Sequence, residues 1–178
     1  MIIATDVQYD EEKRTGLAAA VAFHDWDDAV PFREWTALIT DIEPYVPGQF
    51  YKRELPCILT LLAPVIDEVT AVVVDGHVWL AEDRPGLGHY LWKTLLMDTP
   101  VIGVAKSRFH GGYAKEVLRG GSKKPLYVTA AGMDADDAAL RVAYMHGSNR
   151  HPTLLKRVDQ LCRGLISRRD PSSGCTPC

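Results

Sequence analysis

The stretch EVTAVVVDG, residues 68–76, decides the fold class of this chain. It is an almost continuous run of apolar, mostly β-branched residues that ends at Asp75 and Gly76. Because a strand with one solvated face alternates apolar with polar residues, an unbroken run predicts a central strand covered on both faces. Two further apolar runs, TPVIGVAK at residues 99–106 and PLYVTAAG at residues 125–132, predict additional strands.

The N-terminal part predicts strands joined by short turns. IIATDVQY at residues 2–9 and GLAAAVAFH at residues 16–24 flank the polar turn DEEKRT, which predicts an antiparallel hairpin. AVPFREWTALI, residues 29–39, alternates well enough for a third strand. Hairpins followed by alternating strands and helices favour an α/β fold, a mixed sheet with helices on both faces.

The helix that follows these strands carries an unusual carboxylate. Apolar residues recur at helical spacing from Leu55 to Ile66, so we expect a helix that begins near Glu54, with Pro56 tolerated in its first turn. On the same helical wheel Glu54 lies at the edge of the apolar stripe, which predicts an inward-facing carboxylate.

Three more helices are expected. Residues 87–97 look helical, Asp134 is expected to cap a third helix, and Thr153 is expected to cap the last one. The predicted apolar stripe of the last helix is Leu154, Leu155, Val158, Leu161, Cys162 and Leu165.

The chain has 178 residues and no repeat or linker before its end. We therefore expect one domain over residues 1–166 and a flexible tail over residues 167–178, where a lone pair, Cys175 and Cys178, is weak evidence for metal or redox chemistry. No apolar window approaches a membrane span and the N-terminus lacks a basic signal region, so a cytoplasmic protein without membrane contact is expected.

Charge is unevenly distributed along the chain. The net charge is −3, from 20 basic and 23 acidic residues, which gives no global sign of nucleic-acid binding. Residues 104–124 and 141–170 are nevertheless rich in Lys and Arg. Such segments predict a phosphate-facing side, and solvated helix faces explain them equally well.

Three carboxylates occupy positions that favour apolar packing: Asp6 within the first strand, Asp75 at the end of the central strand, and Glu54. Each has an ordinary explanation, since Asp75 before Gly76 makes a turn, Glu54 favours a helix start or pairs with Arg53, and Asp6 pairs with a buried arginine. Together they favour a shared Mg²⁺ or Mn²⁺ ion, because hard divalent ions bind clustered carboxylate oxygens.

Several segments, in this order, resemble the endonuclease V family. They are TDVQY (5–9), YVPGQFYKRELP (45–56), VVVDGH (72–77) and PVIGVAKS (100–107), and more loosely PLYVTAAG (125–132) and NRHPTLLKRVD (149–159). The resemblance implies a ribonuclease H-like fold. It also implies a metal-dependent endonuclease that cleaves DNA or RNA, single-stranded or mismatched, near inosine, a deaminated adenine.

The resemblance assigns roles to single residues. It places the metal-binding acids at Asp6, Glu54 and Asp75. It places the active-site lysine at Lys106 and the acid of the last helix at Asp159. It places a strand-parting wedge at PYVP, with Tyr45 at the tip and Pro47 stiffening the loop. The pocket for a flipped base would involve Gly48, Phe50, Gly76 and Gly103.

The chain departs from the family's pattern after His77. The family usually continues with a glycine and then His-Pro-Arg, whereas this chain has Val78 and, at residues 81–83, Ala-Glu-Asp. A β-branched residue restricts backbone approach to a base, and added acids make the loop less favourable for phosphate. His77, Arg84 and His89 are candidates to compensate, although ordinary loop or helix roles explain each of them as well.

The sequence thus predicts a Mg²⁺-dependent endonuclease, with Mn²⁺ able to substitute, that acts near deaminated bases. Two alternatives stay open. One is a ribonuclease H-like protein that binds nucleic acid with weak or no cleavage, which the changed loop motivates. The other is a nucleotide-binding enzyme, for which RPGLGHYL offers glycines before a helix without the full Gly-x-Gly-x-x-Gly spacing.

Overall fold

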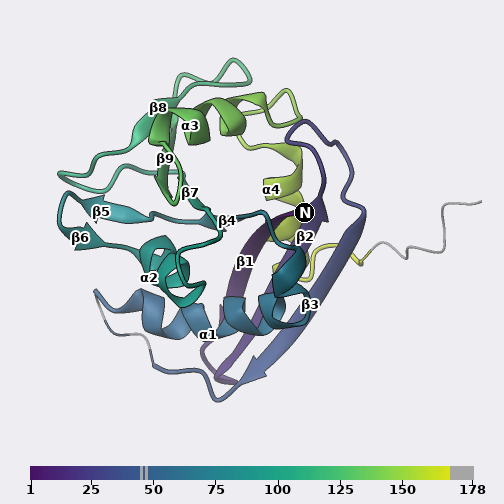
Figure 1. Ribbon diagram of the computed structural model, residues 1–178. Helices are drawn as coiled ribbons and strands as arrows, with labels where there is room; N and C mark the ends of the chain where they lie inside the picture. Colours follow the sequence, from purple (N-terminus) through teal and green to yellow (C-terminus); the bar gives the residue numbers. More distant parts are fainter. Residues whose placement is uncertain (45, 47, 169–178) are drawn as a thin grey trace, which may run out of the picture.

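A mixed sheet of seven strands forms the centre of the molecule in a computed structural model, which describes residues 1–44, 46 and 48–168. The strand order is β3-β2-β1-β4-β7-β9-β8 (Figure 1). The strands are β1 (Ile2–Asp10), β2 (Thr15–Phe23), β3 (Arg33–Thr40), β4 (Ala71–Asp75), β7 (Val101–Ala105), β8 (Lys115–Val117) and β9 (Leu126–Ala131). A small hairpin, β5 (Trp79–Ala81) and β6 (Arg84–Pro85), forms a second sheet.

The pairing of the strands confirms the predicted mixed sheet. β1 and β2 form the expected antiparallel hairpin, from the pair Ile2 and Phe23 to the pair Asp10 and Thr15. β1, β4 and β7 are parallel neighbours, and β9 returns antiparallel to β7. β4 is therefore the central strand that its unbroken apolar run predicted, and its residues 71–74 are buried.

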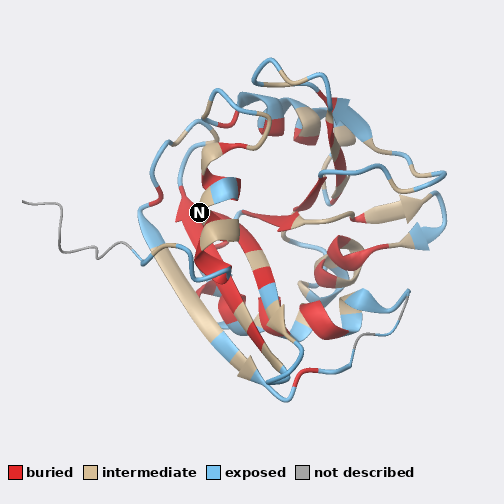
Figure 2. Ribbon diagram, turned by 180° about the vertical axis from the view of Figure 1, so that it is seen from behind, coloured by how far each residue is buried: buried red, intermediate tan, exposed pale blue. Residues whose placement is uncertain are grey.

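Helices cover both faces of the sheet, which confirms the predicted α/β architecture. On one face lie α1 (Phe50–Leu62), a 3₁₀ helix (Ala63–Glu68) and α2 (Leu87–Thr94). On the other face lie α3 (Ala135–Tyr144) and α4 (Thr153–Cys162). Successive residues of a strand point to opposite faces of the sheet, so each central strand contributes to two apolar cores. Figure 2 shows the buried residues along the strands and on the inner surfaces of the helices.

Helix α1 begins earlier than predicted. It starts at Phe50 rather than near Glu54, so the placement of Pro56 in the first turn is wrong and this proline lies inside the helix. Tertiary contacts account for the extra turn, because the ring of Phe50 packs edge-on against Tyr9 at 6.2 Å and that of Tyr51 stacks on Tyr90 at 3.7 Å. Aromatic packing of this kind offsets the backbone hydrogen bond that proline removes.

Of the caps predicted for the two C-terminal helices, that of α3 is confirmed and that of α4 is wrong. Asp134 caps α3 as expected, and its carboxylate accepts hydrogen bonds from two first-turn N–H groups. The cap predicted at Thr153 is wrong, because Pro152 occupies the N-cap of α4 and Thr153 is the first helical residue. Leu165 is 69% exposed, since α4 ends at Cys162 and the apolar stripe ends with it.

Some predictions lie outside the described residues, namely those for Tyr45, for Pro47 and for the tail from residue 169 onward. Near that limit the chain still contacts α4, since the carbonyl of Ser167 accepts a hydrogen bond from Arg157 at 3.0 Å. No helix in the described part of the chain is long and apolar enough to cross a membrane.

Candidate active site

An acidic centre, which we define as Asp6, Glu54 and Asp75, forms where β4 ends and where the parallel pairing of β1 with β4 stops. Thr5 pairs with Val74 across these strands, so Asp6 and Asp75 follow at neighbouring positions and line the same small cleft. Glu54 approaches from α1, close enough for the charges of both aspartates to act on its carboxyl group. Three segments distant in sequence therefore bring their carboxylates together.

The electrostatics of the acidic centre are unfavourable. Glu54 is only 3% exposed, and its Oε2 atom has no hydrogen-bond partner. Burial, and then the charges of Asp6 and Asp75, raise the pKa of Glu54 well above its ordinary value. Burial and the charge of Asp75 also raise the pKa of Asp6 from 3.8 to about 6, although Asp6 accepts a hydrogen bond from the N–H of Val7 at 2.8 Å. Buried, uncompensated carboxylates of this kind lower the stability of the fold.

The neighbouring arginine does not form an ion pair with Glu54. The guanidinium of Arg53 lies over the ring of Tyr9 at 3.8 Å and donates to Glu11 at 2.7 Å, so its charge offsets that of Glu54 only in part. No ion pair between described residues reaches Asp6 or Glu54. The ordinary explanations, a partner arginine for Glu54 or for Asp6, therefore do not describe this structure.

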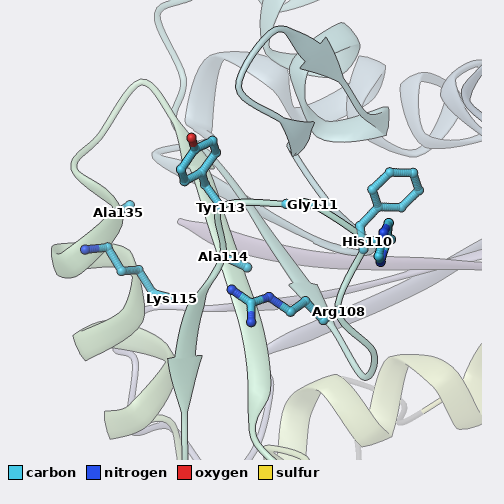
Figure 3. A pocket seen from close by; sticks show the side chains of 9 residues that line it. Arg108, His110, Gly111, Tyr113, Ala114, Lys115 and Ala135 are labelled. Atoms are coloured by element: carbon cyan, nitrogen blue, oxygen red, sulfur yellow. The ribbon is translucent and has the colours of Figure 1, made fainter.

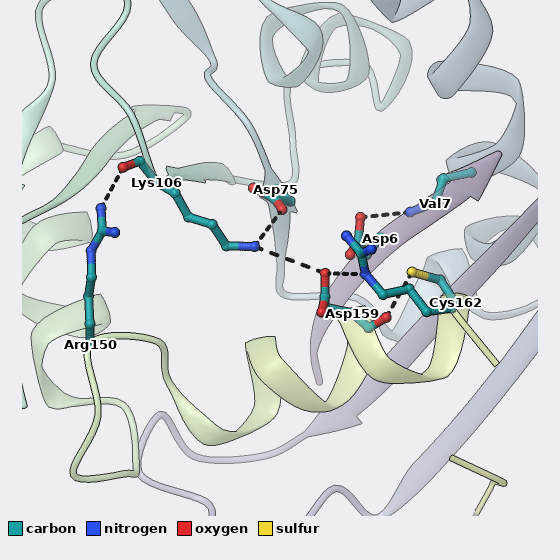
Figure 4. Close-up of polar contacts among 8 residues, drawn as sticks. Asp6, Val7, Asp75, Lys106, Arg150, Asp159 and Cys162 are labelled. Carbon is teal, nitrogen blue, oxygen red and sulfur yellow. Dashed lines mark hydrogen bonds and ion pairs between the residues drawn. The ribbon is translucent and has the colours of Figure 1, made fainter. Parts of the chain in front are cut away.

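Lys106 and Asp159 lie on the open side of the centre (Figure 4). The Nζ atom of Lys106, at the end of β7, is 3.6 Å from a carboxylate oxygen of Asp75 and 4.0 Å from one of Asp159. Asp159, on α4, also pairs with Arg163 at 3.0 Å. The structure thus brings all five predicted catalytic residues together beside the carboxyl ends of β4 and β7, a position where sites of α/β sheets collect.

Two residues of this region were not predicted. His151 lines the cleft with Asp6, and burial followed by the charge of Lys106 lowers the pKa of its imidazole from 6.5 to about 4. Arg150 donates to the carbonyls of Lys106, at 2.5 Å, and of Pro125, at 2.6 Å, which fixes the backbone that carries the lysine. The segment NRHP, residues 149–152, could have predicted both residues, because basic residues beside the start of a helix suit a phosphate-facing site.

The donors of the centre fit a hard divalent cation. Within the described ranges, no three His, Cys, Asp or Glu side chains form a ready-made metal site. One oxygen of Glu54 has no hydrogen-bond partner, and burial and neighbouring acids raise the pKa of both Glu54 and Asp6, so negative charge on these groups would have no counterion from the described residues. Carboxylate oxygens are the ligands that Mg²⁺ and Mn²⁺ prefer.

A cavity of about 370 Å³ opens beside Asp75. Its lining is Gly48, Phe50, Tyr51, Asp75, Gly76, His77, Leu80, Arg84, Pro85, Gly86, Leu87 and Phe109. Three of the four described residues predicted for a base pocket, Gly48, Phe50 and Gly76, are in this lining. Gly103 is not, because it is buried in β7, where a Cβ atom would lie 2.6 Å from the carbonyl oxygen of Gly76. Its missing side chain lets the backbone below the cavity pack closely.

Val78, which departs from the family pattern, and the three residues named as candidates to compensate have distinct environments. Val78 is fully buried and does not line the cavity, and its N–H donates to the hydroxyl of Thr129 at 2.8 Å. His77 and Arg84 do line the cavity, and the Arg84 guanidinium lies 5.1 Å from the centre of the Phe109 ring. His89 instead packs against Trp79, with ring centres 4.3 Å apart.

Comparison with known proteins decides the family. Residues 1–151 match the family model described as Endonuclease V. The chain belongs to the endonuclease V family. This endonuclease V homologue is 30% identical to Endonuclease V of Streptomyces avermitilis, over 91% of this chain and 79% of that protein. It is also 30% identical to the Streptomyces coelicolor Endonuclease V, over 93% of this chain and 78% of that protein.

Solved structures of the family confirm the fold. The crystal structure of the S. avermitilis Endonuclease V superposes with a TM-score of 0.74 at 30% identity and covers 92% of this chain and 80% of its own. The Ciona intestinalis Endonuclease V, in complex with a 24mer DNA that contains an inosine followed by a ribo-adenosine, gives 0.71 at 19% identity, with coverage of 92% and 84%. The predicted ribonuclease H-like fold is consistent with both structures, and membership of the family confirms the predicted enzyme class, an endonuclease.

Proposed function

We propose that this member of the family is a metal-dependent endonuclease that hydrolyses phosphodiester bonds near deaminated bases, inosine above all, in DNA or RNA. The observation that carries the proposal is the acidic centre, in which buried carboxylates lack a counterion beside an open cavity. A cavity of about 370 Å³ lies within the usual range for small-ligand sites. The inosine in the DNA bound to the Ciona relative supports the choice of base.

Asp6, Glu54 and Asp75 would hold Mg²⁺, or Mn²⁺ in its place. The chemistry that such an ion supplies when bound is Lewis-acid activation of water and of the phosphoryl group. It would also provide the positive charge that the buried half of the centre lacks, which makes the closeness of Asp6 and Glu54 tolerable.

Lys106 is the residue of this chain that would act on the phosphate. Its ammonium group lies 3.6 Å from Asp75 and is half exposed, so it is free to stabilise negative charge that grows on the phosphoryl oxygens. Asp159 and the backbone contact from Arg150 would hold Lys106 in place. His151 stays neutral near pH 7, which allows it to accept or donate a hydrogen bond at the cleft.

The cavity would receive the base after it leaves the stack. Flipping costs a few kcal/mol and less where pairing is already weak, which favours mismatched or single-stranded sites. Gly48, Phe50 and Gly76 would surround the flipped base, while Gly103 supports the floor. Tyr45 and Pro47 stay predicted as the wedge that parts the strands.

Cleavage of inosine-containing strands tests this proposal. The protein is incubated in Mg²⁺ with single-stranded DNA and RNA that carry one inosine or one adenosine at the same position. We expect cleavage of the inosine strands and a loss of about 10³-fold in Asp75→Asn, because a metal ligand is removed. Asp67→Asn, an exposed aspartate on the 3₁₀ helix, is the matched control and should cleave normally. Equal rates for wild type and Asp75→Asn would refute the catalytic assignment.

A nucleic-acid-binding protein with weak or no cleavage is the second candidate. The weak cleavage is motivated by the changed loop at residues 78–83 and by the lack of a ready-made metal site among the described residues. Salt-sensitive binding to the same oligonucleotides, with no cleavage in Mg²⁺ or Mn²⁺, would support it.

A further inference from the structure

The loop between β7 and β8 surrounds an open hollow next to the base cavity. The hollow has a volume of about 840 Å³, and the residues that line it are Arg108, Phe109, His110, Gly111, Gly112, Tyr113, Ala114, Lys115 and Ala135 (Figure 3). We call residues 108–115 the aromatic loop. Phe109 lines both this hollow and the base cavity, and Lys106 at the acidic centre lies two residues before the loop. The hollow therefore continues the surface of the site described above.

Contacts hold the aromatic loop in shape. A Cβ atom at Gly112 would lie 2.5 Å from the carbonyl oxygen of Leu80, so the missing side chain lets the loop pack closely on the β5–β6 hairpin. Leu80 also lines the base cavity, so the loop and the cavity share one wall. The Tyr113 hydroxyl donates to Glu82 at 3.2 Å and ties the ring to the same hairpin. A ring restrained in this way loses little entropy when a ligand stacks on it.

The chemistry of the loop suits a nucleic-acid strand. Residues 106–115 contain three Lys or Arg residues and one histidine without any acid. Lys115 is already paired with Asp136 at 2.8 Å. Arg108 is paired only loosely, since it lies 3.7 Å from Glu116 and both side chains are more than half exposed, so the arginine can exchange this contact for a phosphate at little cost. Tyr113 is 67% exposed beside these cations. Positive charge that alternates with exposed aromatic rings is typical of surfaces that bind single strands.

We propose that the aromatic loop is a second nucleotide subsite, in which Tyr113 stacks on an unpaired base that flanks the base in the cavity and Arg108 binds the adjoining phosphate. This rests on the proposed function, because the strand must already enter the base cavity.

Equilibrium binding tests the subsite without cleavage. Fluorescence anisotropy is measured in EDTA with a labelled single-stranded oligonucleotide of about 20 nucleotides that carries one inosine, a length that exceeds usual single-strand site sizes. Tyr113→Ala should weaken binding roughly 5- to 100-fold, whereas Tyr113→Phe, which keeps the ring, should stay within about twofold. Arg108→Gln should lower the slope of log affinity against log salt by about 0.7.

Tyr144→Ala is the matched control. Tyr144 is 66% exposed and its hydroxyl also donates to an acid, Asp27 at 3.3 Å, but it lies on α3 and does not line the hollow. Its substitution should leave binding unchanged. Wild-type binding by Tyr113→Ala, or an equal loss in Tyr144→Ala, overturns the subsite. Because no cleavage is measured, an inactive wild type that still requires Tyr113 for binding would refute only the proposed function.

Discussion

The acidic centre and the adjoining Asp159 form a buried half, Asp6 and Glu54, and a more exposed half, Asp75 and Asp159, and the charges of the two halves are balanced differently. On the exposed half, Asp75 and Asp159 share Lys106, and Asp159 has Arg163 as well. On the buried half, Asp6 and Glu54 have no ion-pair partner among the described residues, and Glu54 has an oxygen without a hydrogen bond.

This distribution is the reverse of what stability alone favours. Exposed ion pairs contribute little, whereas an unbalanced charge away from water costs several kcal/mol. The basic side chains of the protein, Lys106 and Arg163, thus pair with the more exposed acids, where an ion pair contributes least to the stability of the fold. The difference indicates that the buried half is arranged for a positive charge that the chain itself does not supply, which is the reason to place a metal ion there.

The largest expected effect comes from removing the buried charge. Glu54→Gln should lower cleavage of inosine strands by about 10³-fold, because it replaces the carboxylate that we propose as a metal ligand with a neutral group of the same shape. The metal-free variant should unfold at an equal or higher temperature than wild type, since a carboxylate buried without a partner destabilises the fold. A cleavage assay on inosine strands measures the first effect, and thermal denaturation near neutral pH, with and without Mn²⁺, measures the second.

The metal response separates this result from a packing defect. Wild type should gain about 2 to 3 kcal/mol when Mn²⁺ is present at about 100 times its dissociation constant, and Glu54→Gln should gain far less. Glu12→Gln, an exposed glutamate in the turn after β1, should respond as wild type does. A variant that is less stable without metal, yet still responds fully, would show that Glu54 is a packing residue.

A medium effect is expected from the pH dependence of stability in the metal-free protein. The pKa of Asp6 is about 6 in the folded protein and 3.8 in its ordinary state. Protonated Asp6 therefore contributes its full stabilisation to the fold below pH 3.8, and this contribution is lost as the pH rises to about 6. Asp6→Asn should therefore be more stable than wild type by at most about 3 kcal/mol near neutral pH, and the difference should vanish near about pH 4. Urea denaturation in EDTA across this range measures it.

Because His151 also titrates in this pH range, the effect of Asp6 is obtained by subtracting the stability of wild type from that of Asp6→Asn at each pH. The pKa of His151 is about 4 in the folded protein, below its ordinary 6.5, so the stability that neutral His151 contributes is lost as the pH falls. The stability contributed by Asp6 increases over the same fall in pH, so the two effects oppose each other. The wild-type curve alone can look flat. A difference curve that does not change between the two pH limits would show that Asp6 is not desolvated by its surroundings.

Much of this comparison was predictable from the sequence. The unbroken apolar run in β4 and the inward position of Glu54 on its helix were enough to predict a central strand ending at Asp75 and a carboxylate on a buried face. The pairing of β1 with β4 then brings Asp6 beside Asp75. Local patterns predict these features because they depend on which face of one element is apolar.

Other features depend on contacts between distant segments. Helix α1 extends upstream to Phe50 because Tyr9 and Tyr90 contact its first turn, and nothing near Phe50 in the sequence shows this. The short strands β5, β6 and β8 were not predicted, since runs of two or three residues carry no periodicity. Val78 was expected to restrict the base pocket, but its buried position depends on the hydroxyl of Thr129 in β9.

The smallest expected effect is on the exposed half. Arg163→Ala removes the 3.0 Å pair with Asp159, but the arginine side chain is 48% exposed and Lys106 remains within 4.0 Å of the same carboxylate. Stability should therefore change by less than about 1 kcal/mol, and cleavage should stay within about threefold of wild type. Parallel urea denaturation and cleavage assays measure both. A loss comparable to that of Glu54→Gln would mean that the two halves are not balanced differently after all, because the exposed pair would then be essential to the charge of the whole centre.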